Sequence, residues 1–399
     1  MCIYRRRVAA AKPKESEKNT MSETLIYKGR GSAEMFDDYI DFINYVFGMN
    51  GTSEGFPKLL PKLYKPEYHP CENNYVVTVD GKLKSAIGVF PRTFDIMGEK
   101  LVSWGIGNVA VHPYSRSKGY MRELLHTAVD EMIASGADMS DLGGLRQRYA
   151  YFSYESASPV AKYYITGTSV RHCFGGSPLR ELDFREVCEN DPLLDDIIAL
   201  HQKRICHAER PDDEFLDIAR SWSKKLYAVL DGEKLLGYFI GDLCELTLID
   251  NGDFDDVVRN YIAKRGNITI TLPLYETDLL NRAERIADGV SMGNDQNYTI
   301  FHFAKVVGAY MKLKAKTAGL VDGTLSVTVN GIAGTEKFRI DVKNGAPEIT
   351  TIDGDTDLTL DHLEAVAFFF SLSSAARRAN PLAAAWFPLP LFIESADHV

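Results

Sequence analysis

The segment from Leu101 to Ser135 limits the possible folds most, because it joins an apolar strand to an amphipathic helix through one short basic loop. Leu101 to Val111 is predicted to form a strand, and the loop Arg116–Gly119 leads directly into a helix over Tyr120–Ser135. One face of this predicted helix is apolar and consists of Met121, Leu124, Leu125, Ala128 and Met132. A strand, a tight loop and a helix in this order predict an α/β unit.

The same loop has the composition of an anion-binding site. The first backbone N–H groups of a helix are unpaired at its positive end, and Gly119 would let the backbone approach a ligand closely. Arg116 and Lys118 add positive charge, which suits a pyrophosphate. The sequence has no G-x-x-x-x-G-K-[ST] loop. Gly105 to Ala110 has the letters of the G-x-G-x-x-A dinucleotide fingerprint, but it lies inside the predicted strand, so we reject a Rossmann-type site.

A hairpin sequence that occurs twice predicts a duplicated unit. Tyr75 to Leu83 and Tyr227 to Leu235 each contain an Asp-Gly turn between two strands. The two copies start about 150 residues apart, which is the length of one domain. The other elements expected in these units are a helix over Phe36–Phe47, a loop over Gly48–Pro61, and helices over Leu193–Ala208 and Asp213–Lys224.

The last hundred residues have a different pattern, with short alternating strands and Asn-Gly turns between two helices. Pro388 and Pro390 exclude a helix near the end of the chain and predict an extended, aromatic-rich tail. The expected elements are helices over Tyr298–Lys314 and Leu360–Arg377, strands at Leu325–Val329, Phe338–Val342 and Ile349–Ile352, and a tail that begins at Trp386.

Composition excludes several classes of protein. The 45 Lys and Arg residues against 55 Asp and Glu residues give a formal net charge of −10, which argues against a dedicated nucleic-acid-binding protein. No apolar run reaches the ~20 residues that a membrane-spanning helix needs. Six scattered cysteines without a C-x-x-C pair predict neither a disulfide framework nor a metal site, and they favour the reducing cytoplasm. Residues 1–22 are basic and are expected to form a disordered leader, with Met21 as an alternative start.

The strand Val-Ala-Val-His-Pro, followed by Arg-x-x-Gly-x-Met, resembles motif A of the GCN5-related N-acetyltransferases (GNAT), whose pattern is [Q/R]-x-x-G-x-[G/A]. The resemblance implies that acetyl-CoA is the acyl donor. A large apolar residue such as Met121, where most members have Gly or Ala, is similar to the enhanced-intracellular-survival (Eis) branch of the family. By this resemblance, Val109, Ala110 and Val111 line the acetyl-pantetheine, and Arg116, Ser117, Lys118, Gly119, Tyr120, Met121 and Arg122 hold the pyrophosphate.

A second match concerns the catalytic groups. Tyr149 to Tyr154 resembles the Y-x-x-F-G-[F/Y] end of the same domain, with Ser153 in place of Gly, and implies that Tyr149 protonates the leaving thiolate. By position, Gly144 and Leu145 would lie near the acetyl group. The predicted strand contains no carboxylate, and the resemblance implies that the terminal carboxylate of Val399 is the general base. His112, at the end of the strand, is the alternative base.

The resemblance implies a mixed α/β (α+β) fold with tandem GNAT domains and a sterol-carrier-like α+β domain. The expected limits are 23–168 for the first GNAT domain, 169–293 for a degenerate second one, and 294–399 for the last domain. We expect an acetyl-CoA-dependent N-acetyltransferase that acts in a ternary complex on a primary amine of a small polycation, such as an aminoglycoside, or on a lysine side chain. The alternatives are a lipid or acyl-CoA carrier with a degenerate transferase domain, and a longer-chain or peptidyl acyltransferase. The expected enzyme is a cytoplasmic homo-oligomer, by resemblance a hexamer, without a metal, a nucleic acid or a membrane as partner.

Overall fold

A mixed sheet runs through the first two thirds of the chain and joins its two halves. The computed structural model describes residues 24–49, 51 and 55–399, so the expected leader, residues 1–22, lies outside the described residues. In this part of the chain nine strands form the sheet, in the order β1-β2-β3-β4-β5-β13-β6-β12, with β8 beside β3. They are β1 (Ile26–Arg30), β2 (Asn74–Val79), β3 (Lys82–Ile96), β4 (Glu99–Val111), β5 (Met139–Leu142), β6 (Glu155–Ile165), β8 (Cys206–Ala208), β12 (Ile268–Pro273) and β13 (Gly289–Ile300).

Helices cover both faces of the first unit. The buried face of α4 (Tyr120–Ala134) packs on one side of β2–β4, and this face includes the predicted Leu124, Leu125, Ala128 and Met132. On the other side, α1 (Phe36–Gly48) packs against Val76, Ala86 and Ala110. The strand, the loop and the helix of the opening segment therefore form as predicted.

The second unit repeats the order of the first. The first runs β2-β3-β4-α4-β5-α5-β6, and the second runs β9-β10-β11-α9-β12-α10-β13. Both predicted Asp-Gly hairpins are present, as β2–β3 and β9–β10. The remaining elements of this unit are β7 (Asp183–Glu186), β9 (Leu226–Asp231), β10 (Lys234–Ile240), β11 (Glu245–Leu248), α6 (Gly167–Phe174), α7 (Leu194–Gln202), α8 (Phe215–Arg220), α9 (Phe254–Arg265) and α10 (Thr277–Ile286).

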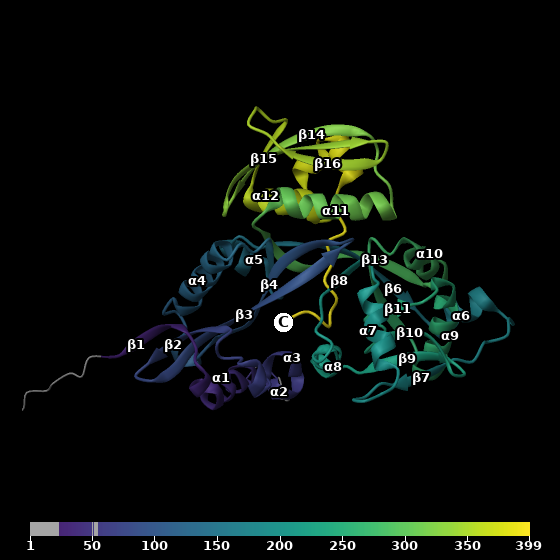
Figure 1. Ribbon diagram of the computed structural model, residues 1–399, viewed down its shortest axis with the longest axis horizontal. Helices are drawn as coiled ribbons and strands as arrows, with labels where there is room; N and C mark the ends of the chain where they lie inside the picture. The colour runs from purple at the N-terminus through teal and green to yellow at the C-terminus, as the bar shows by residue number, and fades with distance from the viewer. Residues whose placement is uncertain (1–23, 50, 52–54) are drawn as a thin grey trace, which may run out of the picture.

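The second unit inserts its last strand into the sheet of the first. β13 lies between β5 and β6, and β12 pairs with the other side of β6. The two units therefore share main-chain hydrogen bonds and lie side by side, the first on the left and the second on the right of Figure 1. The expected limit between the second and third domains, between residues 293 and 294, falls inside β13. The domain limits stay a prediction.

Two predicted helices are wrong at one end, because the residues at that end pair with strands that are distant in the sequence. The helix expected from Tyr298 begins only at Phe303 (α11, Phe303–Thr317), since Tyr298 pairs with β5 as part of β13. The helix expected to reach Ala208 ends at Gln202, since Cys206–Ala208 pair with β3. Smaller differences are α2 (Phe56–Leu59) inside the expected loop Gly48–Pro61 and the end of α12 (His362–Phe370) before Arg377.

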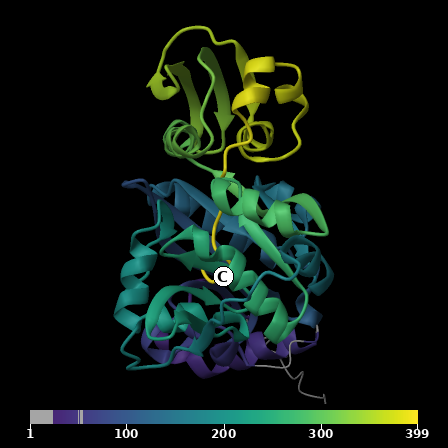
Figure 2. The same cartoon turned by 90° about the vertical axis from the view of Figure 1, so that its right-hand side faces the viewer.

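The third domain lies above the other two (Figures 1 and 2) and returns the chain to them. Its sheet has the order β16-β15-β14-β17, and α11 and α12 pack against it around buried aromatic side chains. After α14 (Pro381–Trp386) no residue is helical or extended in a sheet, in agreement with the prediction from Pro388 and Pro390. This tail descends between the two units and ends at the centre of Figure 1. The sheet strands are β14 (Gly323–Gly331), β15 (Gly334–Lys343), β16 (Ala346–Thr351) and β17 (Leu358–Asp361).

Candidate active site

Next to the predicted anion-binding loop, one edge of β4 has no neighbouring strand in the described part of the chain. β4 pairs with the parallel strand β5 only from Ser103 to Ile106, so the following residues have no strand on that side. Opposite β3, the register shifts at a bulge where Asn108 has a φ of 52°. The bulge is tied to α1, because the Asn108 side-chain amide donates to the Tyr39 hydroxyl over 3.1 Å. Main-chain groups near Val109 are therefore available to a ligand.

A cavity of about 940 Å³ lies along this open edge. Gly119 precedes α4 with a φ of 83°, and a Cβ built there would meet only the Arg122 guanidinium, at 3.7 Å. The cavity therefore leaves room for a group at the helix N-terminus. Six of the seven residues expected at a pyrophosphate line it: Arg116, Ser117, Gly119, Tyr120, Met121 and Arg122. Lys118 is exposed and is not among the lining residues.

The three residues expected along the acetyl-pantetheine do not all face this cavity. Val109 and Val111 line it. Ala110 points to the opposite face of β4, where it is buried with α1. Gly144 and Leu145, expected near the acetyl group, are also outside its lining. Gly144 instead makes room for the Tyr149 ring, since a Cβ there would lie 2.7 Å from a ring carbon.

Tyr149 ends α5 (Arg146–Tyr149) and is buried in the core under α4. Its burial raises the pKa of the phenol, which keeps the hydroxyl protonated. Its neighbours Arg148, Tyr151 and Phe152 line the 940 Å³ cavity, whereas Tyr149 is not among the lining residues. Ser153, which replaces a glycine of the family pattern, has a φ of 66°. This left-handed conformation explains why a glycine is suited to that position.

The end of the tail lies on the other face of β4. Val399 packs with Ala110 and α1. Two glycines of β4 make room for it: a Cβ at Gly105 would lie 2.5 Å from the Val399 side chain, and a Cβ at Gly107 would lie 3.2 Å from the carbon of its terminal carboxylate. The gap between β4 and β5 therefore lies between the 940 Å³ cavity and Val399. His112 is elsewhere, with its ring against those of Tyr45 and Tyr114.

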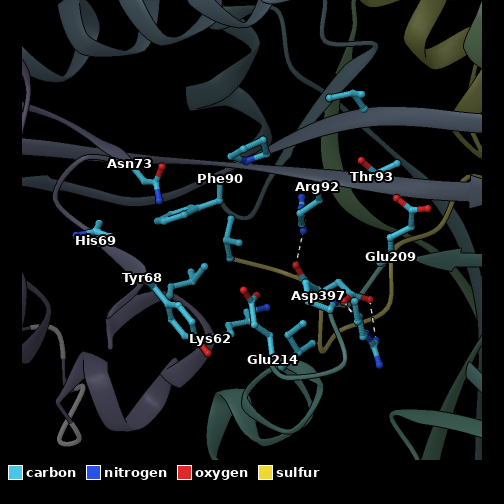
Figure 3. Close-up of a pocket in the computed structure, with 18 of the residues that line it drawn as sticks. Lys62, Tyr68, His69, Asn73, Phe90, Arg92, Thr93, Glu209, Glu214 and Asp397 are labelled. Atoms are coloured by element: carbon cyan, nitrogen blue, oxygen red, sulfur yellow. Dashed lines mark hydrogen bonds and ion pairs between the residues drawn. The ribbon is translucent and has the colours of Figure 1, made fainter. Parts of the chain in front are cut away.

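Side chains of both units hold the tail. The Lys62 ammonium donates to the carbonyls of Ala396 and His398, over 2.5 and 2.6 Å. From β3, Arg92 binds the carbonyl of Asp397 (Figure 3) and also the carboxylate of Asp141. The second unit adds a bond from Trp222 to the His398 carbonyl, one from Lys224 to Ser395, and an ion pair of Arg204 with Glu394.

A fully buried arginine anchors the tail to the second unit. The Arg210 guanidinium binds both carboxylate oxygens of Asp397, over 2.9 and 2.8 Å. It also binds both oxygens of Glu245 on β11, over 3.1 and 2.7 Å. The positive charge of Arg210 lowers the pKa of both carboxyl groups against the effect of burial, so both stay ionised.

A second cavity, of about 770 Å³, reaches Val399 from the space between the two units. Figure 3 shows its walls, which come from α3 (Pro61–Tyr64), β3 and the start of α8. Glu67, Glu209 and Glu214 line it. Lys62, Arg92 and Arg210 line it as well, but each of these three is bonded to the tail. Burial and the nearby Asp213 and Asp217 raise the pKa of Glu214, as expected where negative charge gathers. A cationic group in this cavity would relieve that repulsion.

Sequence reasoning did not identify the tail anchors. Lys62, Arg92, Arg210 and Asp397 belong to no motif, and Arg210 and Asp397 are 187 residues apart. Neither their spacing nor any periodicity in the sequence indicates that these residues lie close together. The described residues contain no cluster of His, Cys, Asp and Glu able to hold a metal ion. None of the helices described is both long and apolar enough to cross a bilayer.

Comparison with known proteins agrees with this geometry. Residues 30–155 match the family model of the acetyltransferase (GNAT) domain, and no curated protein matches the chain. A probable N-acyltransferase of unknown function from Enterococcus faecalis is 16% identical, with 94% of this chain and 100% of that chain covered and a TM-score of 0.66. A GCN5-related N-acetyltransferase from Anabaena variabilis is 16% identical (93% and 98% covered, TM-score 0.62), and Eis1 from Mycobacterium abscessus is 12% identical (94% and 100% covered, TM-score 0.59). These likenesses establish a GNAT-like mixed α/β fold.

Proposed function

We propose that this chain, with its GNAT acetyltransferase-like domain, is an acetyl-CoA-dependent N-acetyltransferase that acts on a primary amine in a ternary complex. The observation that carries the proposal is the gap beside β4, with a cavity lined by Arg116 and Arg122 on one side and, on the other, a cavity at Val399 whose lining includes three glutamates. The first suits a polyanionic acyl donor, and the second suits a cationic acceptor. Direct transfer requires the acyl donor and the amine acceptor to meet, and the gap beside β4 lies between their two cavities.

The residues of the first cavity fit a coenzyme A diphosphate. The loop is concave and open at Gly119, α4 presents unpaired N–H groups at its start, and two guanidinium groups line the wall. Main-chain groups of Val109 and Val111 would bind the pantetheine arm along the open edge of β4. When bound, the coenzyme supplies an acetyl thioester. Lys118 would act only through its charge, because it lies outside the cavity wall.

The second cavity supports a small polycation or a lysine side chain as the acceptor. Among the described residues, neither Glu67 nor Glu214 forms an ion pair with a cation, whereas Glu209 pairs with Lys100. Amines enter as ammonium ions at neutral pH, so carboxylates along the entrance would raise their local concentration. An aminoglycoside is one such polycation. The amine must lose a proton before it can attack the thioester, and the Val399 carboxylate is the group that we assign as base.

We assign the leaving-group proton to Tyr149, whose raised pKa keeps it protonated. Tyr149 is not among the residues that line the 940 Å³ cavity, so donation to the thiolate requires a small movement of the cavity wall or an intervening water. The open main-chain edge of β4 offers N–H donors to the developing oxyanion.

Tyr149→Phe should lower turnover by about 10²–10⁴-fold, because it removes the proton donor and leaves the ring in place. The affinity for acetyl-CoA should change little, since the loop at Gly119 is unaffected. Steady-state rates and calorimetric binding of acetyl-CoA measure the two effects. Tyr164→Phe, on an exposed tyrosine of β6, is the matched control. Wild-type turnover in Tyr149→Phe would remove Tyr149 from the mechanism.

Gly119→Glu should weaken acetyl-CoA binding at least about a hundredfold, equivalent to ~2.7 kcal/mol. The new carboxylate would stand where we expect the pyrophosphate, at a backbone φ of 83° that favours glycine. Gly136→Glu is the matched control, because Gly136 ends the same helix with a φ of 75° and open space around it. Calorimetric titration gives both affinities. If Gly119→Glu binds as tightly as Gly136→Glu, the diphosphate does not bind at this loop.

The activity itself is tested by acetyl-CoA-dependent thiol release with a panel of amines that includes aminoglycosides and lysine peptides. Competition between acetyl-CoA and longer acyl-CoAs separates an acetyltransferase from a longer-chain or peptidyl acyltransferase. Binding of a fatty-acid or sterol probe without any transfer would favour the lipid or acyl-CoA carrier. The third domain does not favour that role, since Phe338, Phe368, Phe369 and Trp386 fill its interior and are fully buried.

We also propose a cytoplasmic homo-oligomer. Free thiols at all cysteines of the described residues support a reducing compartment. Val290 and Met292 expose apolar surface on β13, which a second copy would cover. Light scattering after size exclusion, with a Val290→Glu variant beside the wild type, measures the oligomeric state; the expectation of a hexamer comes from the family resemblance alone.

A further inference from the structure

A third, smaller cavity also reaches Val399. It has a volume of about 280 Å³ and is lined by Asp141 on β5, Gln296 on β13, and His398 and Val399 of the tail. Since liquid water takes ~30 Å³ per molecule, a space of this size accommodates a short chain of waters. It lacks the row of glutamates that lines the 770 Å³ cavity. The catalytic base therefore has a polar outlet besides the acceptor cavity.

His398 lines this outlet, and only one of its two ring nitrogens has a hydrogen-bond partner among the described residues. Nδ1 is 3.2 Å from the Gln296 side-chain amide. Nε2 is buried and has no hydrogen-bond partner; an oxygen of the Asp295 carboxylate lies 3.9 Å from it. Bonds from Lys62 and Trp222 to the His398 carbonyl fix the main chain. A buried ring nitrogen without a partner, beside the assigned base, needs an explanation.

The charges around His398 suit a group that takes up a proton and then releases it. Asp141 and Asp295 favour the imidazolium, whereas Arg92 and Lys62 and the burial of the ring disfavour it and lower the pKa. The Gln296 amide can present its nitrogen or, turned by 180°, its oxygen to Nδ1. Nδ1 therefore keeps a partner in both protonation states, and only Nε2 must exchange a proton.

We propose that His398 carries the proton lost by the amine from the Val399 carboxylate to solvent through the 280 Å³ cavity. The proposal rests on the proposed acetyltransferase activity. Overall, R–NH₃⁺ and the acetyl thioester give the N-acetyl amine, the free thiol and one proton. The Val399 carboxylate accepts that proton from the ammonium, a water passes it to His398 Nε2, and the imidazolium releases it to the water of the cavity. The carboxylate is then ready for the next amine. The second N–H proton, which the nitrogen loses as the tetrahedral adduct collapses, replaces the one that Tyr149 gives to the thiolate. In this scheme His398 acts through Val399 and does not touch the substrate.

The test is chemical rescue. His398→Ala should lower turnover at least about tenfold in a buffer without imidazole, with the KM for acetyl-CoA unchanged. Added imidazole should restore a large part of the rate, because it fits the enlarged cavity and replaces the missing proton carrier. His398→Gln keeps the main-chain bonds and most of the volume, should show the same loss, and guards against misfolding. His172→Ala, on the exposed face of α6, should not respond to imidazole.

Wild-type turnover in both variants, or a loss that imidazole does not restore in His398→Ala, would overturn the proposal. Such a result leaves the acetyltransferase activity intact, since the wild-type rate is measured in the same experiment. Absence of any transfer by the wild-type chain would instead refute the proposed function.

Discussion

Deletion of Val399 is expected to lower turnover by about 10²–10⁴-fold, the usual contribution of a general base. The deletion moves the terminal carboxylate back by one residue, or ~3.5 Å, away from Gly105 and Gly107. The new carboxylate would replace the His398 carbonyl that Lys62 and Trp222 now bind, so both partners would hold it away from β4. Single-turnover rates with acetyl-CoA and a good amine acceptor measure the loss.

Val399→Ala is the matched control because it keeps the carboxylate and removes only the side chain. It should retain most of the turnover, whereas the deletion should not. Binding of acetyl-CoA should be unchanged in both, since the loop at Gly119 lies on the other face of β4. If the deletion is as active as Val399→Ala, the carboxylate is not the base, and water or His112 takes that role.

Local sequence signals were enough to predict the strand, loop and helix around the proposed donor site. The strand predicted over Leu101–Val111 is observed at Glu99–Val111, and the helix predicted to start at Tyr120 starts there. The apolar strand, the glycine before the helix and the apolar face of the helix follow one another in a single stretch of sequence. Each of these signals agrees with the same local structure. The side on which Ala110 points was not predictable, because the bulge at Asn108 changes the alternation of the strand.

The part of the site at the tail could not be predicted, because its contacts join distant parts of the chain. β13 enters the sheet of the first unit, but only its last four residues, Asn297–Ile300, pair with β5. This paired stretch and the three-residue strand Cys206–Ala208 are too short to show alternation. Lys62, Arg92 and Arg210 converge on the tail from three elements. Their positions follow from the pairing of the two units and not from any motif.

The arrangement gives the second unit a function although it lacks the loop of the first. The segment between β11 and α9 corresponds to the basic loop before α4, and it contains Asp250 and Asp253 in place of arginines. Carboxylates there would repel a diphosphate. The same unit supplies Arg210 and Arg204 to the tail. The second unit therefore holds the terminus that we propose as the base for the first.

Arg210→Met should destabilise the folded chain by about 3–5 kcal/mol at pH 7.5, the usual cost of removing one partner of a buried ion pair. Asp397 and Glu245 would both remain buried without the Arg210 guanidinium, and Glu245 would keep only the longer ion pair with Arg204, at 3.5 Å. Loss of the Asp397 anchor should also release the tail and reduce turnover together with stability. Urea denaturation followed by fluorescence, with turnover measured on the same samples, gives both effects.

Arg180→Met is the matched control, because Arg180 also joins two carboxylates, Asp231 and Asp253, but at the surface, where such pairs contribute at most ~1 kcal/mol. The effect of pH has a definite sign. Arg210 lowers the pKa of Asp397 and Glu245, so in the wild type its contribution is complete above their ordinary values near 4 and is lost only as the pH falls through the lowered ones. In Arg210→Met both carboxyl groups would bind protons readily, so the difference from the wild type should shrink between pH 7.5 and pH 5. A destabilisation no larger than that of Arg180→Met, or one independent of pH, would show that the tail is held without Arg210.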